Sequence, residues 1–328
     1  MKLATLKNGT RDGQLVLVNR TLTSAVAVPD IAVTMQELLD NWNALTPELA
    51  RRYEQFEQGT IAGTFAFSLA DAMAPLPRAY QWCDGSAYLS HAELVRRARK
   101  AEMPDFLYHD PMLYQGGSDT FLGPLDDIEV ADAEWGIDLE AEVAVITGDV
   151  PMGADRQTAQ AAIRLVTIIN DVSLRNLIPH ELSKNFGFFQ SKPSTAFAAV
   201  AVTTDELAPY WDGAKLGLPL MSWVNNKPLG CPDAGVDMNF DFPDLIIHAA
   251  KSRRLGAGTI VGSGTVSNRD RAVGSSCLAE RRMLEIIDND VATTPFLQFG
   301  DTVSIDMRDP FDQSLFGEIR QTVVQYEG

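Results

Sequence analysis

The sequence is poor in cysteine and in positive charge, and both shortages exclude classes of protein. Its 328 residues include three cysteines, Cys83, Cys231 and Cys277, which are odd in number and too far apart for a disulfide framework or a C-x-x-C zinc site. Lysine and arginine total 27 against 44 acidic residues, a net charge of −17. Such a chain repels phosphate, so we expect neither a nucleic acid nor an anionic membrane surface as a partner.

Long apolar runs and the common catalytic motifs are also missing. No stretch approaches the roughly 18 apolar residues of a membrane helix, and the first residues lack the apolar core of a signal peptide, so we expect a cytoplasmic protein. There is no G-x-S-x-G, Walker A or H-E-x-x-H motif, which disfavours the commonest hydrolase, nucleotide-binding and zinc-protease chemistries. The glycine-rich run 256–265 fails the dinucleotide fingerprint in its spacing, and we interpret Gly256 as the end of a helix.

The remaining pattern predicts two domains of unequal size. Residues 1–19 contain two strand-like runs around Asn-Gly and Asp-Gly turns, and residues 33–59 have the spacing of a helical pair. The chain breaks at Pro75-Leu76-Pro77, so we place a small N-terminal domain at 1–75 and a larger domain at 76–328. In the larger domain, helical stretches at 155–166 and 242–255 interrupt many strand-like segments. This predicts a β-rich α+β fold, a rolled or sandwiched β core with helices on its rim.

One predicted strand, residues 136–146, carries carboxylates on a single face. Alternate residues of a strand share a face, so Asp138, Glu140 and Glu142 project together while apolar residues fill the opposite face. Carboxylates about 7 Å apart repel one another unless a positive group lies between them. The pattern fits the solvated face of an edge strand. It also fits a strand that enters the core with its carboxylates at the mouth of a site, which the apolar Ala144 and Ile146 further along that face favour.

Other candidates are not decided by spacing alone. An apolar run ends in Asn-Asp at 170–171, which suits either a ligand or an ordinary turn. His91 follows Asp84 by seven residues, where it is either functional or simply the start of a helix. Lys192 lies in a loop directly before a proline, and we interpret His248, in an apolar helix, as a packing residue.

The order of these segments resembles the fumarylacetoacetate hydrolase family. IDLEAEVAVITG is followed by INDVSLRN, by a loop with a Ser-Lys pair, and by VGSGTVSN and GSSCLAE, so the resemblance covers roughly residues 80–325. The N-terminal region loosely resembles the small N-terminal domain of longer members. The resemblance implies a mixed β-sandwich roll, a homodimer, and one Mg²⁺ or Ca²⁺ in each active site.

Carried onto this sequence, the resemblance implies four metal ligands: Asp84, Glu140, Glu142 and Asp171. Four carboxylates without clustered cysteine or histidine make a hard, oxygen-only site, which suits Mg²⁺ or Ca²⁺ better than zinc or copper. A cation would also relieve the repulsion between the two glutamates. Asp138 shares their face, but the family motif selects the glutamates.

The same resemblance implies the roles of six further residues. They are the general base His91, the glutamate that orients it, Glu280, the oxyanion-stabilising Lys192 and Arg175, and the substrate contacts Tyr114 and Thr265. An unperturbed imidazole titrates near neutral pH, which suits a base that takes a proton from water.

The implied reaction is metal-dependent hydrolysis of a carbon–carbon bond in a 1,3-diketo acid. The first substrate we expect is 4-fumarylacetoacetate, cleaved to fumarate and acetoacetate in tyrosine or aromatic catabolism. Alternatives are an acylpyruvate hydrolase of the fumarylpyruvate type, a 2-oxo acid decarboxylase or hydratase at the same metal, and a non-catalytic metal-stabilised binding protein. Ser86 stands where the family has a tyrosine, and Ile178 where it has a glutamine, which leaves the acyl group open.

Overall fold

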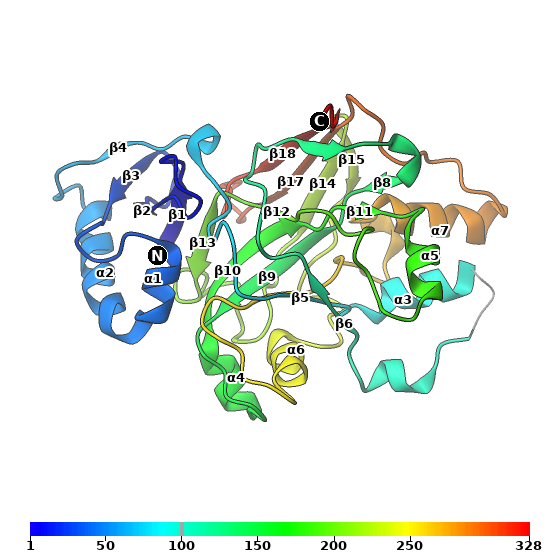
Figure 1. Ribbon diagram of the computed structural model, residues 1–328, viewed down its shortest axis with the longest axis horizontal. Coiled ribbons are helices and arrows are strands. Elements are labelled where there is room, and N and C mark those ends of the chain that lie inside the picture. Colours follow the sequence, from blue (N-terminus) through cyan, green and yellow to red (C-terminus); the bar gives the residue numbers. More distant parts are fainter. Residues whose placement is uncertain (99–101) are drawn as a thin grey trace.

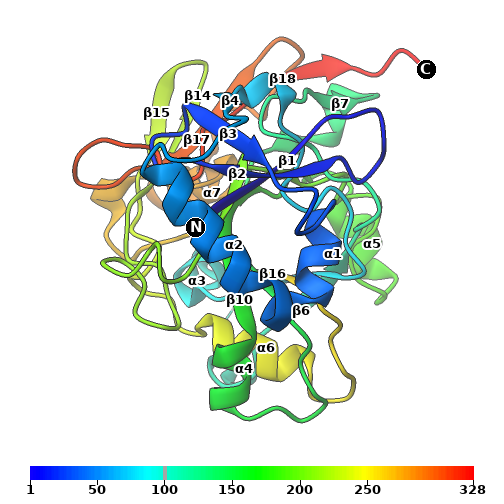
Figure 2. The same cartoon turned by 90° about the vertical axis from the view of Figure 1, so that its left-hand side faces the viewer.

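The structure, a computed structural model, describes residues 1–98 and 102–328. Its N-terminal part, blue in Figure 1, contains the expected hairpin, because β1 (Lys2–Leu6) pairs antiparallel with β2 (Gln14–Val18). Strands β3 (Ser24–Ala27) and β4 (Phe65–Ala66) continue this sheet outward. The expected helical pair is α1 (Met35–Asp40) and α2 (Trp42–Glu57), which lie in the foreground of Figure 2. Their apolar residues share a core with the leucines of β1 and β2.

The sheet begun in the N-terminal part continues into the larger part of the chain. Strand β1 also pairs with β13 (Val200–Thr203), and beyond β13 the neighbours are β10 (Ile163–Asn170), β9 (Ala141–Thr147), β16 (Ile260–Gly262), β5 (Trp82–Gly85) and β6 (Leu113–Gly116). The short β12 (Ala196–Phe197) pairs with β10. Strand β9 therefore lies in the interior of the sheet, with β10 on one side and β16 on the other.

A second sheet packs against the first. It runs in the order β15 (Lys227–Gly230), β14 (Leu220–Val224), β17 (Thr302–Met307), β18 (Ile319–Gln325) and β7 (Ile128–Val130). Strand β17 contacts β10, and β14 contacts β9, so the two sheets enclose a common core. A separate pair joins β8 (Ile137–Asp138) to β11 (Ser173–Leu174).

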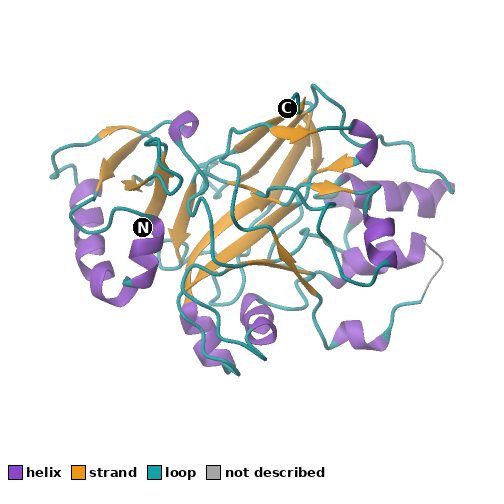
Figure 3. Ribbon diagram, viewed as in Figure 1, coloured by secondary structure: helices purple, strands orange, loops and turns teal. Residues whose placement is uncertain are grey.

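Helices surround these strands, as Figure 3 shows. They are α3 (Leu89–Ala98), α4 (Arg156–Ala162), α5 (Ile178–Ser183), α6 (Phe242–Ala249) and α7 (Leu278–Asn289), with single 3₁₀ turns at Leu69–Asp71, Asp105–Tyr108, Ala133–Trp135 and Arg271–Val273. The expected β-rich α+β fold with helices on its rim is confirmed. Within the described ranges, no helix combines the length and apolar character needed to cross a membrane.

Two helix boundaries differ from the expectation. Helix α6 ends at Ala249, so Gly256 does not end it, because residues 251–254 are exposed and polar and have no apolar surface to pack against. Helix α4 ends at Ala162, because Ile163 already pairs with Thr147 as the start of β10. In both places the tertiary environment, an absent packing surface after α6 and a strand partner after α4, decides the helix end against the helical pattern of the sequence.

Candidate metal centre and active site

Four carboxylates converge where the central strands of the large sheet lie side by side. They belong to Asp84 in β5, Glu140 just before β9, Glu142 in β9 and Asp171 just after β10, and one oxygen from each lies within 4.8 Å of all the others. The strand register brings them together, since Gly262 of β16 lies opposite both Asp84 and Ala144. A Cβ atom at residue 262 would lie 2.5 Å from a carboxylate oxygen of Asp84, so only glycine allows this approach.

The carboxylates are buried, with exposed fractions of 0% for Glu142 and Asp171 and 5–6% for Asp84 and Glu140. The interpretation as a solvated face of an edge strand is therefore wrong, because β9 is an interior strand. Burial, followed by the charge of Asp171, raises the pKa of Asp84 to about 8. Burial and the charge of Asp84 raise the pKa of Glu142 well above its usual value. With all four groups ionised, the cluster would therefore carry more negative charge than its surroundings compensate.

Two cations partly compensate this charge. Lys192 Nζ lies 2.5 Å from Glu140 Oε2 and 2.6 Å from Asp171 Oδ2, and Arg175 Nη2 lies 2.7 Å from Glu140 Oε1. Burial acts to raise the pKa of Glu140, but Arg175 and Lys192 hold that pKa well below its usual range. Neither cation bonds to Glu142, and both of its oxygens lack a hydrogen-bond partner among the described residues.

These orphaned oxygens fit a bound divalent cation. An unpartnered buried carboxylate is costly unless a metal or another positive group binds it. Oxygen-only donor sets select hard cations such as Mg²⁺, Ca²⁺ or Mn²⁺. The residues present therefore suit the metal that the sequence implied, and Asp138, as expected, is not among the four converging carboxylates.

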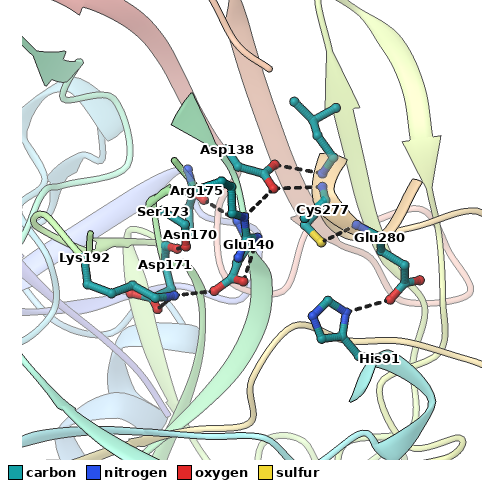
Figure 4. Close-up of polar contacts among 12 residues, drawn as sticks. His91, Asp138, Glu140, Asn170, Asp171, Ser173, Arg175, Lys192, Cys277 and Glu280 are labelled. Carbon is teal, nitrogen blue, oxygen red and sulfur yellow. Dashed lines mark hydrogen bonds and ion pairs between the residues drawn. The ribbon is translucent and has the colours of Figure 1, made fainter. Parts of the chain in front are cut away.

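Beside the cluster lies a histidine–glutamate pair. His91 is in the first turn of α3, Glu280 is in the first turn of α7, and these two helices pack together. His91 Nδ1 lies 2.9 Å from Glu280 Oε2 (Figure 4). With the Glu280 carboxylate as the acceptor of this bond, the ring proton lies on Nδ1 and Nε2 is free to accept a proton. His91 thus begins a helix and is also held by a buried acid.

A pocket of about 600 Å³ joins the pair to the cluster. Most of the expected site residues line it: Asp84, His91, Tyr114, Glu140, Arg175, Lys192 and Thr265. Glu142, Asp171 and Glu280 are buried next to these lining residues. The two departures from the family pattern, Ser86 and Ile178, also line the pocket, so they face whatever binds there.

Tyr114, Phe188 and His248 also line the pocket, and of these three only Phe188 was not singled out in the sequence. Tyr114 donates a hydrogen bond of 2.6 Å to Asp171 Oδ2, and its ring meets Phe188 edge-on with centroids 5.4 Å apart. His248 was interpreted as a packing residue, but it lines the pocket and lies 3.3 Å from Asp110. Phe188 belongs to an FGFF run that was visible in the sequence, yet nothing in its spacing indicates which ring turns inward.

Comparison with known proteins assigns both parts of the chain. Residues 81–324 match the family model "Fumarylacetoacetate (FAA) hydrolase C-terminal", and residues 1–78 match "Fumarylacetoacetase N-terminal domain 2". Among curated proteins, oxaloacetate tautomerase YisK of Bacillus subtilis is 26% identical over 211 residues. That alignment covers 62% of this chain and 65% of the tautomerase, just under two thirds of its length.

Solved structures share the fold over the whole chain. Fumarylacetoacetate hydrolase from Exiguobacterium antarcticum has a TM-score of 0.67 at 17% identity and covers 99% of this chain and 100% of its own. Maleylpyruvate hydrolase from Sphingobium sp. SYK-6, in complex with manganese(II) and pyruvate, has a TM-score of 0.64 at 17% identity, with 100% of both chains covered. At these identities the likeness concerns the fold.

Proposed function

This chain belongs to the fumarylacetoacetate hydrolase family, and from its site we propose that it hydrolyses a carbon–carbon bond in a 1,3-diketo acid. The first substrate to test is 4-fumarylacetoacetate, with fumarate and acetoacetate as products. The observation that carries the proposal is that the imidazole of His91, held by Glu280, lines the same pocket as two carboxylates of the buried four-carboxylate cluster.

Asp84, Glu140, Glu142 and Asp171 would hold the divalent cation. When bound, such a cation acts as a Lewis acid that polarises carbonyl oxygens and favours an enolate. The relative with manganese(II) and pyruvate supports this assignment.

The chain's own residues then supply the proton transfers. Nε2 of His91 takes a proton from water, and the hydroxide adds to the carbonyl carbon of the acyl group. Glu280 keeps the ring oriented and stabilises its positive charge. The carbon–carbon bond breaks with its electron pair on the departing carbon, which then receives the proton from His91. The products are two carboxylic acids, and water is consumed.

Lys192 stabilises the oxygen that becomes negative during the addition. An ammonium group has three N–H donors, and two of them face Glu140 and Asp171, so one remains for a substrate oxygen. A donor of this kind typically contributes about 3–4 kcal/mol to the transition state. Arg175 also lines the pocket, and its ion pairs with Asp138 and Glu140 hold the guanidinium in place there.

A second candidate is a 2-oxo acid tautomerase, favoured by the match to oxaloacetate tautomerase over 62% of the chain. The same base could move a proton between carbon and oxygen without breaking the carbon skeleton. Hydrolysis of an acylpyruvate is an outcome of the same test.

Product analysis by proton NMR separates these functions. Protein loaded with Mg²⁺ or Mn²⁺ is mixed in turn with fumarylacetoacetate, fumarylpyruvate and enol-oxaloacetate. Fumarate and acetoacetate from the first substrate support the proposal, and fumarate and pyruvate from the second keep the reaction class but change the leaving group from acetoacetate to pyruvate. Faster enol–keto exchange of oxaloacetate, with no cleavage of either diketo acid, would replace the proposal with the tautomerase.

A further inference from the structure

One buried carboxylate near the site is neither a member of the cluster nor a partner of His91. Asp138, in β8, has an exposed fraction of 0%. Its Oδ1 accepts the backbone N–H of Leu278 at 2.7 Å, and its Oδ2 accepts the N–H of Ala279 at 2.9 Å and Nε–H of Arg175 at 2.8 Å. All three partners are donors, so the geometry suits an ionised carboxylate.

The first two contacts fix the start of helix α7. Its first residues leave N–H groups without partners inside the helix. Asp138 binds the N–H groups of Leu278 and Ala279, and Cys277 Sγ accepts that of Glu280 at 3.3 Å. The carboxylate thus holds the helix at the two residues before Glu280, the residue that binds His91. A negative charge at this end also interacts favourably with the helix dipole.

The third contact leads to the carboxylate cluster. Arg175 Nε binds Asp138 while its Nη2 lies 2.7 Å from Glu140 Oε1 (Figure 4). The pairing of Ser173 with Asp138 in the β8–β11 ladder brings Arg175 to this position. Asp138 therefore lies between two parts of the site, with the helix that carries Glu280 on one side and Arg175 with Glu140 on the other.

We propose that Asp138 is a positioning residue that sets the His91–Glu280 pair relative to the four-carboxylate cluster. This inference rests on the proposed function for its effect on turnover, but its effect on the His91–Glu280 hydrogen bond does not depend on the substrate. Misplacing a catalytic group by about 1 Å costs on the order of 100-fold in rate. A carboxylate that fixes the start of the helix carrying Glu280 can therefore have a large effect on the rate, because Glu280 holds His91.

The test variant is Asp138→Asn. The amide keeps the size of the side chain, but its NH₂ group faces N–H donors that the carboxylate accepted. We expect kcat to fall about 10- to 100-fold with KM changed less than about threefold. A matched control is Asp306→Asn. Asp306 has an exposed fraction of 1% and accepts from Met307 N, Arg308 Nε and Ser314 Oγ, but it lies in β17 and does not line the pocket.

Two readouts distinguish positioning from a general loss of stability. In the Glu280→Gln background, Asp138→Asn should lower kcat by less than about twofold, because Asp138 acts on His91 through Glu280, which is already replaced. With ¹⁵N-labelled histidine, of which the chain has four, the hydrogen-bonded Nδ1–H signal of His91 should vanish in Asp138→Asn and Glu280→Gln and persist in Asp306→Asn.

A second variant keeps the test valid should Asp138→Asn not fold. Leu278→Pro removes one N–H that Asp138 accepts, and proline is tolerated in the first turn of a helix. It should weaken the same NMR signal while Asp138 itself remains. An intact Nδ1–H signal in the variants that fold would overturn the inference. So would an equal loss of kcat from Asp138→Asn in the wild type and in Glu280→Gln. A wild-type protein without turnover would instead refute the proposed function and leave the NMR test standing.

Discussion

Replacing Glu181 by glutamine should destabilise the protein at neutral pH by an amount that shrinks in acid. Glu181, in α5, has an exposed fraction of 6%, and its carboxylate accepts the N–H groups of Phe189, Gln190 and Ser191 and the hydroxyl of Ser191. These bonds hold the loop that leads directly to Lys192.

The magnitude follows from the ionisation of Glu181. Burial acts to raise its pKa, but the hydrogen bonds from Ser191 and the backbone amides lower that pKa from 4.5 to about 2. One pKa unit corresponds to about 1.4 kcal/mol, so the ionised carboxylate contributes about 3 kcal/mol above the unfolded-state pKa. Because the folded-state pKa is depressed, this contribution is complete at pH 7 and is lost as the pH falls from 4.5 toward 2. At pH 3 less than half of it should remain.

The assay is urea denaturation of the wild type and of Glu181→Gln between pH 7 and pH 3, with Glu285→Gln as the matched control. Glu285, in α7, accepts hydrogen bonds from Thr293 and Thr294, and these also lower its pKa to about 2 against the effect of burial. Both variants should lose stability in the same pH-dependent way.

Only Glu181→Gln should also lower kcat, because the loop it anchors carries Phe188 and Lys192. A free-energy difference from the wild type that does not change with pH would refute the reasoning about ionisation. An equal loss of kcat in Glu285→Gln would refute the link to Lys192.

Three further substitutions test the cluster and its neighbours. Glu142→Gln removes a buried carboxylate whose oxygens have no hydrogen-bond partner among the described residues. The EDTA-treated variant should therefore melt at or above the wild-type temperature, and Mn²⁺ should not raise its melting temperature as it raises that of the wild type. A melting temperature below that of the wild type without metal would contradict this. Lys192→Met removes the cation that Glu140 and Asp171 share, so it should lower the melting temperature of the EDTA-treated protein. Added Mn²⁺ should reduce the difference in melting temperature between this variant and the wild type. If thermal scans show the same difference with and without Mn²⁺, the lysine and the metal do not share a site. Tyr114→Phe removes the hydrogen bond to Asp171 but keeps the ring, so kcat should fall about three- to tenfold in steady-state kinetics. A loss above about 100-fold would mean that the hydroxyl itself takes part in the reaction.

Local sequence rules predicted the elements better than they predicted the site. The hairpin at β1 and β2 and the α1–α2 pair follow from turn residues and apolar spacing, and both expectations are confirmed. The approach of His91 to Glu280 joins residues 189 positions apart, and no periodicity reports such a distance. It was expected only from the resemblance to a family, and the roles of both residues stay predictions.

Asp138 shows why strand alternation fell short. Alternation placed it on the same face as Glu140 and Glu142, but β8 ends at Asp138 and β9 begins at Ala141. The break between the two strands lets the glutamates turn to the cluster while Asp138 turns to the N-terminus of α7. The alternation rule assumes a continuous strand, so it cannot show that two of the three acids join the cluster while the third binds the start of a helix.

The central claim, metal-dependent cleavage with His91 as the base, is tested most directly by following the enol absorbance of fumarylacetoacetate. The wild type, His91→Ala and the control His109→Ala, whose histidine is exposed and does not line the pocket, are measured with Mg²⁺ and with EDTA. We expect loss of absorbance for the wild type and His109→Ala with metal only, and at least a 100-fold slower loss for His91→Ala. Undiminished turnover in EDTA or in His91→Ala would contradict it.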